Sequence, residues 1–290
     1  MRLGCNSLIR NPDDPSKWVD VEIMIDLVRK LGLDLMDLQL DRGLQSLDPN
    51  YLSTIRRKCE SSGIEIGYAG VGGGFVGVAK DSAGMPVGKA LDHDEVKARI
   101  SEVERGIDAA QVLGTTLIRL FAGRIPDATP DRSVIWNGVI SAYQRVADYA
   151  SRKGVRIGLH NHPPAVAPTG NDILQIKSAI DRENVTIILD TGQWHGAPGT
   201  NLEGISDPDV DVNFYGYMDQ VIPHASYVRA KIYRIDSGSE EWLDYPRIFR
   251  ILSSQDYDGP VSIVFEDRKN ECSYQDALSM AVKHLRSTFS

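Results

Sequence analysis

The chain has 290 residues, of which 42% are hydrophobic and 25% are charged. These proportions are ordinary for a water-soluble globular protein, and the length suffices for one large domain. The formal net charge is −8, and an acidic surface repels the phosphate backbone of nucleic acids, so we expect no nucleic-acid partner.

The cysteines and the N-terminus indicate the cellular compartment. Cys5, Cys59 and Cys272 are odd in number and far apart, which argues against a disulfide framework and against a structural zinc site. The first residues turn polar too soon for a signal peptide, and no apolar run is long enough to span a membrane. We therefore expect a cytoplasmic protein without a membrane partner.

Short apolar segments alternate along the chain with longer segments of helical periodicity. In chain order, the predicted pairs of a strand and its following helix are 2–8 and 19–31, 33–40 and 49–61, 64–71 and 94–112, 115–123 and 133–152, 155–160 and 171–181, 185–190 and a short helix after 206, 226–233 and 244–254, and 260–267 and 273–287. Asp48 is the expected N-cap of the second helix. The glycine-rich segment 72–92 and the segment 191–206 are predicted to be long loops.

Eight strands that each precede a helix favour parallel pairing and a single (β/α)8 TIM barrel, an α/β fold, as one domain over 1–290. The alternative is a doubly wound open sheet. No GxGxxG motif opens a helix after the first strand, and the glycines of GVGGGF (70–75) lead into a loop instead. The barrel is therefore the favoured architecture.

Ionisable residues lie at or near the carboxyl ends of five predicted strands. They are Arg119, His160 with His162, Asp190, Arg229 with Lys231, and Glu266. The carboxyl ends of barrel strands meet at one mouth, where active sites form, and burying so many charges without use is costly. The pattern predicts an active site at this mouth.

Four segments carry a family resemblance: GLHNH (158–162), ILDTGQW (188–194), YVRAKIY (227–233) and SIVFED (262–267). With them, the sequence resembles the xylose isomerase-like TIM-barrel superfamily, which includes sugar isomerases and epimerases, hydroxypyruvate isomerase, inosose dehydratase and endonuclease IV. In that family a metal is typically held by Glu, Asp, His and Glu on strands five to eight. The resemblance matches Asp190 and Glu266 to two of these ligands and Lys231 to a common lysine.

The chain departs from the family at two positions, with His160 in place of the Glu and Arg229 in place of the His. Two arrangements stay open. His160, Asp190 and Glu266 hold a divalent metal (Mn, Zn or Mg) while Arg229 turns toward the substrate. Alternatively, the guanidinium of Arg229 replaces the metal and forks across Asp190 and Glu266.

The resemblance implies proton abstraction next to the carbonyl of a sugar or sugar derivative by an isomerase or epimerase, with metal assistance. Glu266 is the expected base, and if it is free of metal, burial is expected to raise its pKa. His162 is a second acid or base, and Lys231 joins them as a catalytic group that polarises the carbonyl. Arg119 and Arg229 are expected to bind substrate, and Trp194, with Trp136, to form an apolar wall against the sugar.

Two other functions remain open at the level of sequence. A lyase or dehydratase acting on keto-sugars or oxidised glycosides shares the first proton abstraction. A non-catalytic sugar-binding barrel would bind a sugar without turnover. In each case the partner is a small-molecule sugar, and the sequence leaves homo-oligomerisation undecided. Endonuclease chemistry is the least favoured, because of the net charge and the six histidines.

Overall fold

The computed structural model describes residues 2–125, 132–162, 169–200 and 208–289. Its main feature is a closed barrel of eight strands, all paired in parallel, in the cyclic order β1-β2-β3-β6-β7-β8-β9-β10. The barrel strands are β1 (Leu3–Asn6), β2 (Leu35–Gln39), β3 (Glu65–Gly70), β6 (Leu117–Phe121), β7 (Arg156–His160), β8 (Val185–Asp190), β9 (Ala225–Ile232) and β10 (Val261–Phe265). The predicted (β/α)8 barrel is confirmed, and the open doubly wound alternative is wrong because β10 pairs with β1.

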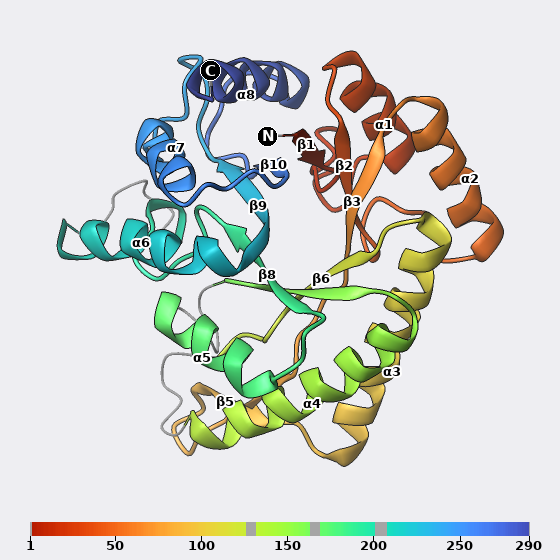
Figure 1. The fold of residues 1–290 in the computed structure, drawn as a ribbon, viewed down its shortest axis with the longest axis vertical. Coiled ribbons are helices and arrows are strands. Elements are labelled where there is room, and N and C mark those ends of the chain that lie inside the picture. The colour runs from red at the N-terminus through yellow and green to blue at the C-terminus, as the bar shows by residue number, and fades with distance from the viewer. Residues whose placement is uncertain (1, 126–131, 163–168, 201–207, 290) are drawn as a thin grey trace.

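A ring of α-helices surrounds these strands (Figure 1). The helices are α1 (Val21–Lys30), α2 (Pro49–Ser61), α3 (His93–Leu113), α4 (Ser133–Arg152), α5 (Gly170–Ile180), α6 (Pro208–Val221), α7 (Tyr245–Ser254) and α8 (Tyr274–Thr288). Single 3₁₀ turns cover Pro198–Thr200 (η1) and Ile222–His224 (η2). Asp48 caps α2 as predicted, with its side chain accepting the backbone N–H groups of Asn50 and Tyr51. Helix α6 has 14 residues and is longer than the short helix expected. The segment 201–206 of the second predicted loop lies outside the described residues.

The segment 72–92 is not the simple loop that its glycines suggested. It contains an antiparallel hairpin of β4 (Val76–Lys80) and β5 (Pro86–Ala90), which packs beside α4 (Figure 1). The turn is held by Asp81, whose side chain accepts the backbone N–H groups of Ala83 and Met85. Because glycine and lysine alternate with small apolar residues here, the period-two pattern of a strand was too weak to recognise.

The barrel strands divide their side chains between two environments. On β9, Val228, Ala230 and Ile232 belong to the main apolar core. The alternate residues Tyr227, Arg229 and Lys231 share the opposite face, toward the barrel interior. A separate small apolar cluster of Tyr68, Leu117, Ile188 and Tyr227 lies within the barrel. The strand alternation therefore places polar groups inside the barrel, above an apolar floor.

A buried carboxyl group links this floor to the polar interior. Asp37 on β2 is fully buried and accepts a hydrogen bond of 2.5 Å from the hydroxyl of Tyr227. The rings of Tyr68 and Tyr227 meet edge to face, with centroids 5.1 Å apart. Burial raises the pKa of Asp37 to about 7, although the nearby hydroxyl groups of Ser262 and Tyr227 oppose the shift.

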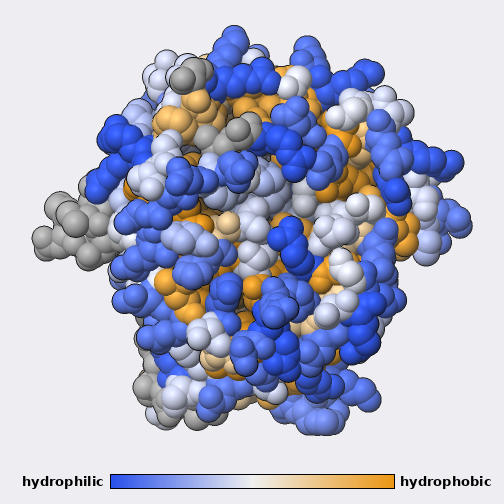
Figure 2. Space-filling model, viewed as in Figure 1, coloured by the Kyte–Doolittle hydropathy of each residue, from blue (hydrophilic) through white to orange (hydrophobic). Residues whose placement is uncertain are grey.

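The face of the molecule seen in Figure 2 is mainly hydrophilic, with apolar residues scattered between polar ones. This is the usual surface of a folded domain, in which single exposed apolar residues are normal. In the part of the chain that the structure describes, every helix is too short or too polar to cross a lipid bilayer.

Gly158 on β7 gives a test of the barrel packing. A Cβ atom at this position would overlap the Cγ1 and Cδ1 atoms of Ile188, which is fully buried in the floor. We expect Gly158→Ala to lower the free energy of unfolding by about 1–3 kcal/mol, and Ile188→Val to offset part of this loss in the double variant. Urea unfolding of the single and double variants measures both changes in the free energy of unfolding.

Gly138 in α4 is the matched control, because a Cβ there meets no atom within 4 Å. Gly138→Ala should leave stability unchanged or raise it by up to about 1 kcal/mol, since alanine is the better helix former. Equal stability of Gly158→Ala and the wild type would contradict the close contact between β7 and β8.

Candidate active site

The barrel brings most of the predicted site residues together at the carboxyl ends of neighbouring strands. His160 ends β7 and Asp190 ends β8. Asp190 is the register partner of Arg229 on β9, and Lys231 pairs in register with Val264 on β10. Glu266 directly follows β10. Four strands that are adjacent in the barrel therefore supply one continuous cluster of charged side chains.

Asp190 is the centre of this cluster and is fully buried. Its Oδ1 atom accepts the backbone N–H of Gly192 at 3.0 Å. Its Oδ2 atom lies 3.3 Å from Nζ of Lys231, 3.5 Å from Nη1 of Arg229 and 3.6 Å from Nε2 of His160. Burial alone would raise the pKa of this carboxyl, but Lys231, His160 and Arg229 outweigh burial and hold the pKa well below its usual value. Asp190 is therefore an ionised counter-charge for the cations around it.

Lys231 joins Asp190 to Glu266, the most accessible carboxylate of the cluster. Nζ of Lys231 donates to Oε2 of Glu266 at 3.1 Å, and Arg268 pairs with the other oxygen of the same carboxylate. The Glu266 side chain keeps 35% exposure. Burial favours a higher pKa for Glu266, but Lys231 and Arg268 outweigh it, so the pKa lies below the usual value. The expected rise in the Glu266 pKa is wrong, because two cations hold the carboxylate ionised.

His160 lies between two guanidinium groups. Its Nε2 atom is 2.7 Å from Nη1 of Arg229, and its Nδ1 atom is 3.2 Å from Nη1 of Arg119. Burial and Arg229 lower the His160 pKa well below its usual value, so the imidazole is neutral near neutral pH. A neutral imidazole has a single lone pair to offer, and the shorter contact assigns it to Nε2, which accepts from Arg229.

Arg119 is held by a residue that the sequence analysis did not single out. Its Nη2 atom donates to Oε1 of Gln39, which ends β2, at 2.9 Å. The amide nitrogen of Gln39 donates in turn to Asp41 at 2.7 Å. Gln39 is a polar residue at a strand end, so the rule that found His160 and Asp190 also applies to it. Gln193 and Arg268, which contact Glu266, lie in loops where no strand pattern marks them.

Asn161 and His162 have different positions around the cluster. The side chain of Asn161 accepts the backbone N–H of Asp190 at 2.7 Å and donates to the carbonyl groups of Asp190 and Gln193 at 2.9 Å. Asn161 therefore fixes the end of β8. The ring of His162 lies 5.9 Å from that of His160 and 5.8 Å from that of Phe121, between centroids, which places it beside the cluster.

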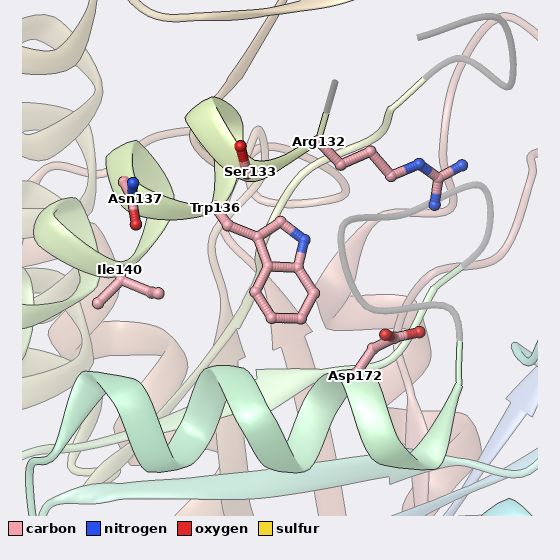
Figure 3. A pocket seen from close by; sticks show the side chains of 6 residues that line it. All are labelled: Arg132, Ser133, Trp136, Asn137, Ile140 and Asp172. Carbon is pink, nitrogen blue, oxygen red and sulfur yellow. The ribbon is translucent and has the colours of Figure 1, made fainter. Parts of the chain in front are cut away.

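The two tryptophans expected to form a sugar wall lie apart from each other. Trp194 is fully buried, and its ring lies 5.7 Å from that of Tyr217 on α6, so it offers no surface to a sugar here. Trp136 lines a cavity of about 370 Å³ between α4 and α5, together with Asn137, Ile140 and Asp172 (Figure 3).

The donor set does not fit a divalent metal at this position. A metal ligated by His160 and Asp190 needs the Nε2 lone pair and the Oδ2 atom, and both face cationic nitrogens at 2.7–3.5 Å. The guanidinium of Arg229 and the ammonium of Lys231 would repel a second positive ion placed among them. In 2–125, 132–162, 169–200 and 208–289, no three His, Cys, Asp or Glu side chains are grouped so that they could hold a metal. We derive no step through a metal.

The expected fork of Arg229 across both carboxylates also differs from the structure. Arg229 contacts His160 and approaches Asp190, whereas Lys231 bridges Asp190 and Glu266. Lys231 lies two residues closer than Arg229 to the strand ends that precede Glu266, and Arg268 already pairs with the other oxygen of Glu266. Arg229 and Lys231 therefore share the pairing with the two carboxylates that was expected of Arg229 alone.

Comparison with known proteins agrees with this architecture. An inosose isomerase of Halalkalibacterium halodurans is 23% identical over 196 residues, which are 66% of this chain and 67% of that protein. A D-psicose 3-epimerase of Clostridium cellulolyticum H10, solved with D-tagatose, superposes with a TM-score of 0.72 over 100% of both chains at 16% identity. A 3-keto-D-glucoside 4-epimerase of E. coli gives 0.69 over 99% of both chains at 18% identity. Residues 25–287 match the xylose isomerase-like TIM barrel family, and the chain belongs to that family.

Proposed function

We propose that the protein is a sugar isomerase or epimerase that removes a proton next to a carbonyl group and uses fixed side-chain cations at the position where the family resemblance implies a metal. One observation carries the proposal. Glu266, an ionised and partly exposed carboxylate, lies in the same cluster as Lys231 and Arg229 at the mouth of the barrel. A base beside two fixed cations is the arrangement that an enediolate intermediate requires.

The relatives support the substrate class. One is named for inosose, one for D-psicose and one for a 3-keto-D-glucoside. Each name denotes a polyhydroxylated compound with a carbonyl group, in which a proton on the neighbouring carbon is acidic enough to be removed by a carboxylate once the carbonyl is polarised. We infer a substrate of this kind, a ketose or another keto-polyol.

In this mechanism Glu266 accepts the proton from the carbon next to the carbonyl. The C–H bond breaks, its electron pair forms the C=C bond of an enediolate, and the carbonyl oxygen gains negative charge. Lys231 and Arg229 donate N–H groups toward that oxygen, and Asp190 holds both donors in place. Return of the proton to the same carbon from the opposite face gives an epimer. Return to the former carbonyl carbon, with transfer of the neighbouring hydroxyl proton to the negatively charged oxygen, gives an isomer. His162 is the proposed second acid.

Replacement of the base tests the proposal directly. Glu266→Gln should lower the rate of deuterium uptake from D₂O into a reactive ketose by about 10²–10⁴-fold, the usual contribution of a general base. Proton NMR and mass spectrometry of the product measure exchange and identify it. Glu60→Gln, an exposed carboxylate paired with Arg56 on α2, is the control and should keep full activity. A product of lower mass would instead indicate a lyase or dehydratase, and binding without exchange a non-catalytic barrel.

The pH profile follows from the cations beside Glu266. Because Lys231 and Arg268 hold the Glu266 pKa below its usual value of 4.5, the base stays ionised as the pH falls, and the acid limb of kcat/KM should lie below 4.5. Arg268→Met removes one of these cations, so the limb should move to higher pH. Circular dichroism at each pH separates titration from unfolding. An acid limb near pH 7 would assign the base to another group.

The absence of a metal requirement is a further prediction. We expect that activity survives dialysis against EDTA and that elemental analysis finds far less than one equivalent of Mn, Zn or Mg. The double variant His160→Glu/Arg229→His restores the residue types that the family carries at these two positions, and it should bind about one equivalent of Mn²⁺. One equivalent of metal in the wild type, lost in Glu266→Gln, would overturn the metal-free mechanism.

A further inference from the structure

Arg119 is a buried cation with no carboxylate partner. Its exposure is 8%, and among the residues that the structure describes no carboxylate lies within ion-pair distance of it. Burial and the nearby Arg229 lower the Arg119 pKa to about 10, which leaves the guanidinium charged at neutral pH. A buried charge without a counter-charge is costly, so its retention at the mouth needs a reason.

The hydrogen bonds of Arg119 are also incomplete. Its Nη2 atom donates to Gln39, while its buried Nε atom has no partner. The neutral imidazole of His160 can accept from only one of its two neighbours, Arg119 at Nδ1 or Arg229 at Nε2, and the shorter contact favours Arg229. Gln39 takes one of the five N–H groups of the guanidinium, and the buried Nε–H has no acceptor.

The surrounding residues fix Arg119 in this unpaired state. Gln39 is a neutral acceptor, and Asp41 holds its amide in the orientation that presents the oxygen to Arg119. Gly70 makes room for the pair, because a Cβ at that position would overlap the Gln39 side-chain oxygen and lie 3.2 Å from Nε of Arg119. The neutral amide of Gln39 thus orients the guanidinium of Arg119. The carboxylate of Asp41 contacts Gln39 and not Arg119.

The charged side chains at the mouth of the barrel also add up to an excess of positive charge. Three cations, namely Arg229, Lys231 and Arg268, contact the two ionised carboxylates of Asp190 and Glu266, and Arg119 lies next to them against His160. The whole protein, by contrast, has a formal net charge of −8. A local excess of positive charge on an acidic protein attracts anions to that place and orients them.

We propose that the substrate carries an anionic group, a carboxylate or a phosphate, and that this group pairs with Arg119, oriented by Gln39 as a positioning residue. The proposal rests on the proposed sugar chemistry at the same mouth and narrows its substrates to acidic or phosphorylated keto-polyols. The anion supplies the missing counter-charge and accepts from the unused guanidinium donors. The reacting carbon then lies on the side of Lys231 and Glu266.

Matched ligands test the proposal without turnover. Isothermal titration calorimetry compares D-gluconate with D-glucitol, and D-glucitol 6-phosphate with D-glucitol, because the members of each pair share a carbon skeleton and differ in charge. We expect at least one anion to bind about tenfold or more tightly than D-glucitol. The pair with the larger difference identifies the anion as a carboxylate or a phosphate.

Three variants assign the effect to Arg119. Arg119→Met should abolish the preference for the anion over D-glucitol. Gln39→Glu keeps the shape of the side chain and supplies an internal counter-charge, so it should reduce anion affinity about tenfold and, with an anionic substrate, raise KM more than it lowers kcat. Arg182→Met removes an exposed arginine paired with Asp148, changes the net charge equally and should have no effect.

The outcomes separate this inference from the proposed function. Equal binding of charged and neutral ligands, or equal behaviour of Arg119→Met and Arg182→Met, overturns the anion site. If neutral ketoses still exchange deuterium in that case, the isomerase chemistry stands alone. Anion binding that depends on Arg119, without exchange in any substrate, supports the anion site and contradicts the catalytic proposal.

Discussion

The buried carboxylate of Asp190 is the interaction on which the rest of the site depends. Arg229 and Lys231 are 5% and 3% exposed, and two cations at such depth require an anion beside them. Asp190 lies between them with no exposure, and its position is set by Gly192 and by the clamp of Asn161 on the end of β8. The positions of the Arg229 and Lys231 cations are therefore set by Asp190 and the backbone of β8, and not by the flexible ends of their own side chains.

Cations on side chains differ from a metal in what they permit. A metal ion polarises an oxygen and also generates a nucleophilic hydroxide from bound water. A guanidinium or an ammonium stabilises negative charge on an oxygen but supplies no hydroxide. An arginine in place of the histidine thus suits a reaction that must stabilise the negative oxygen of an enediolate. It is poorly suited to phosphodiester hydrolysis, which needs a hydroxide. The net charge of −8 points in the same direction, since it disfavours a nucleic-acid substrate.

The barrel and much of its mouth were predictable because each strand and helix shows its own local pattern. Asp48 before α2 and the apolar run of β8 are signals of this kind. The hairpin of β4 and β5 was missed because its glycines mask the alternation. The pairing within the site was beyond sequence reasoning for another reason. Strand order places Asp190 near Arg229 and Lys231, but which cation reaches Glu266 depends on side-chain conformations and on Arg268, a loop residue.

Arg229 and Lys231, the two cations nearest Asp190, are more deeply buried than Arg268. The buried cations and Arg268 therefore have different roles. Arg229 has Asp190 on one side, and its acidic neighbours Tyr68, Asp190 and Asp37 together outweigh the burial that opposes its protonation and raise its pKa. Asp37 is in turn fixed by Tyr227, two residues before Arg229 on β9. Asp190, Asp37 and Tyr227 thus hold the guanidinium of Arg229 in a fixed position. It needs no reorganisation when negative charge develops beside it. Arg268 follows β10 in a loop and its side chain is 26% exposed, so it can adjust to the protonation state of Glu266 while the deeper cations stay in place.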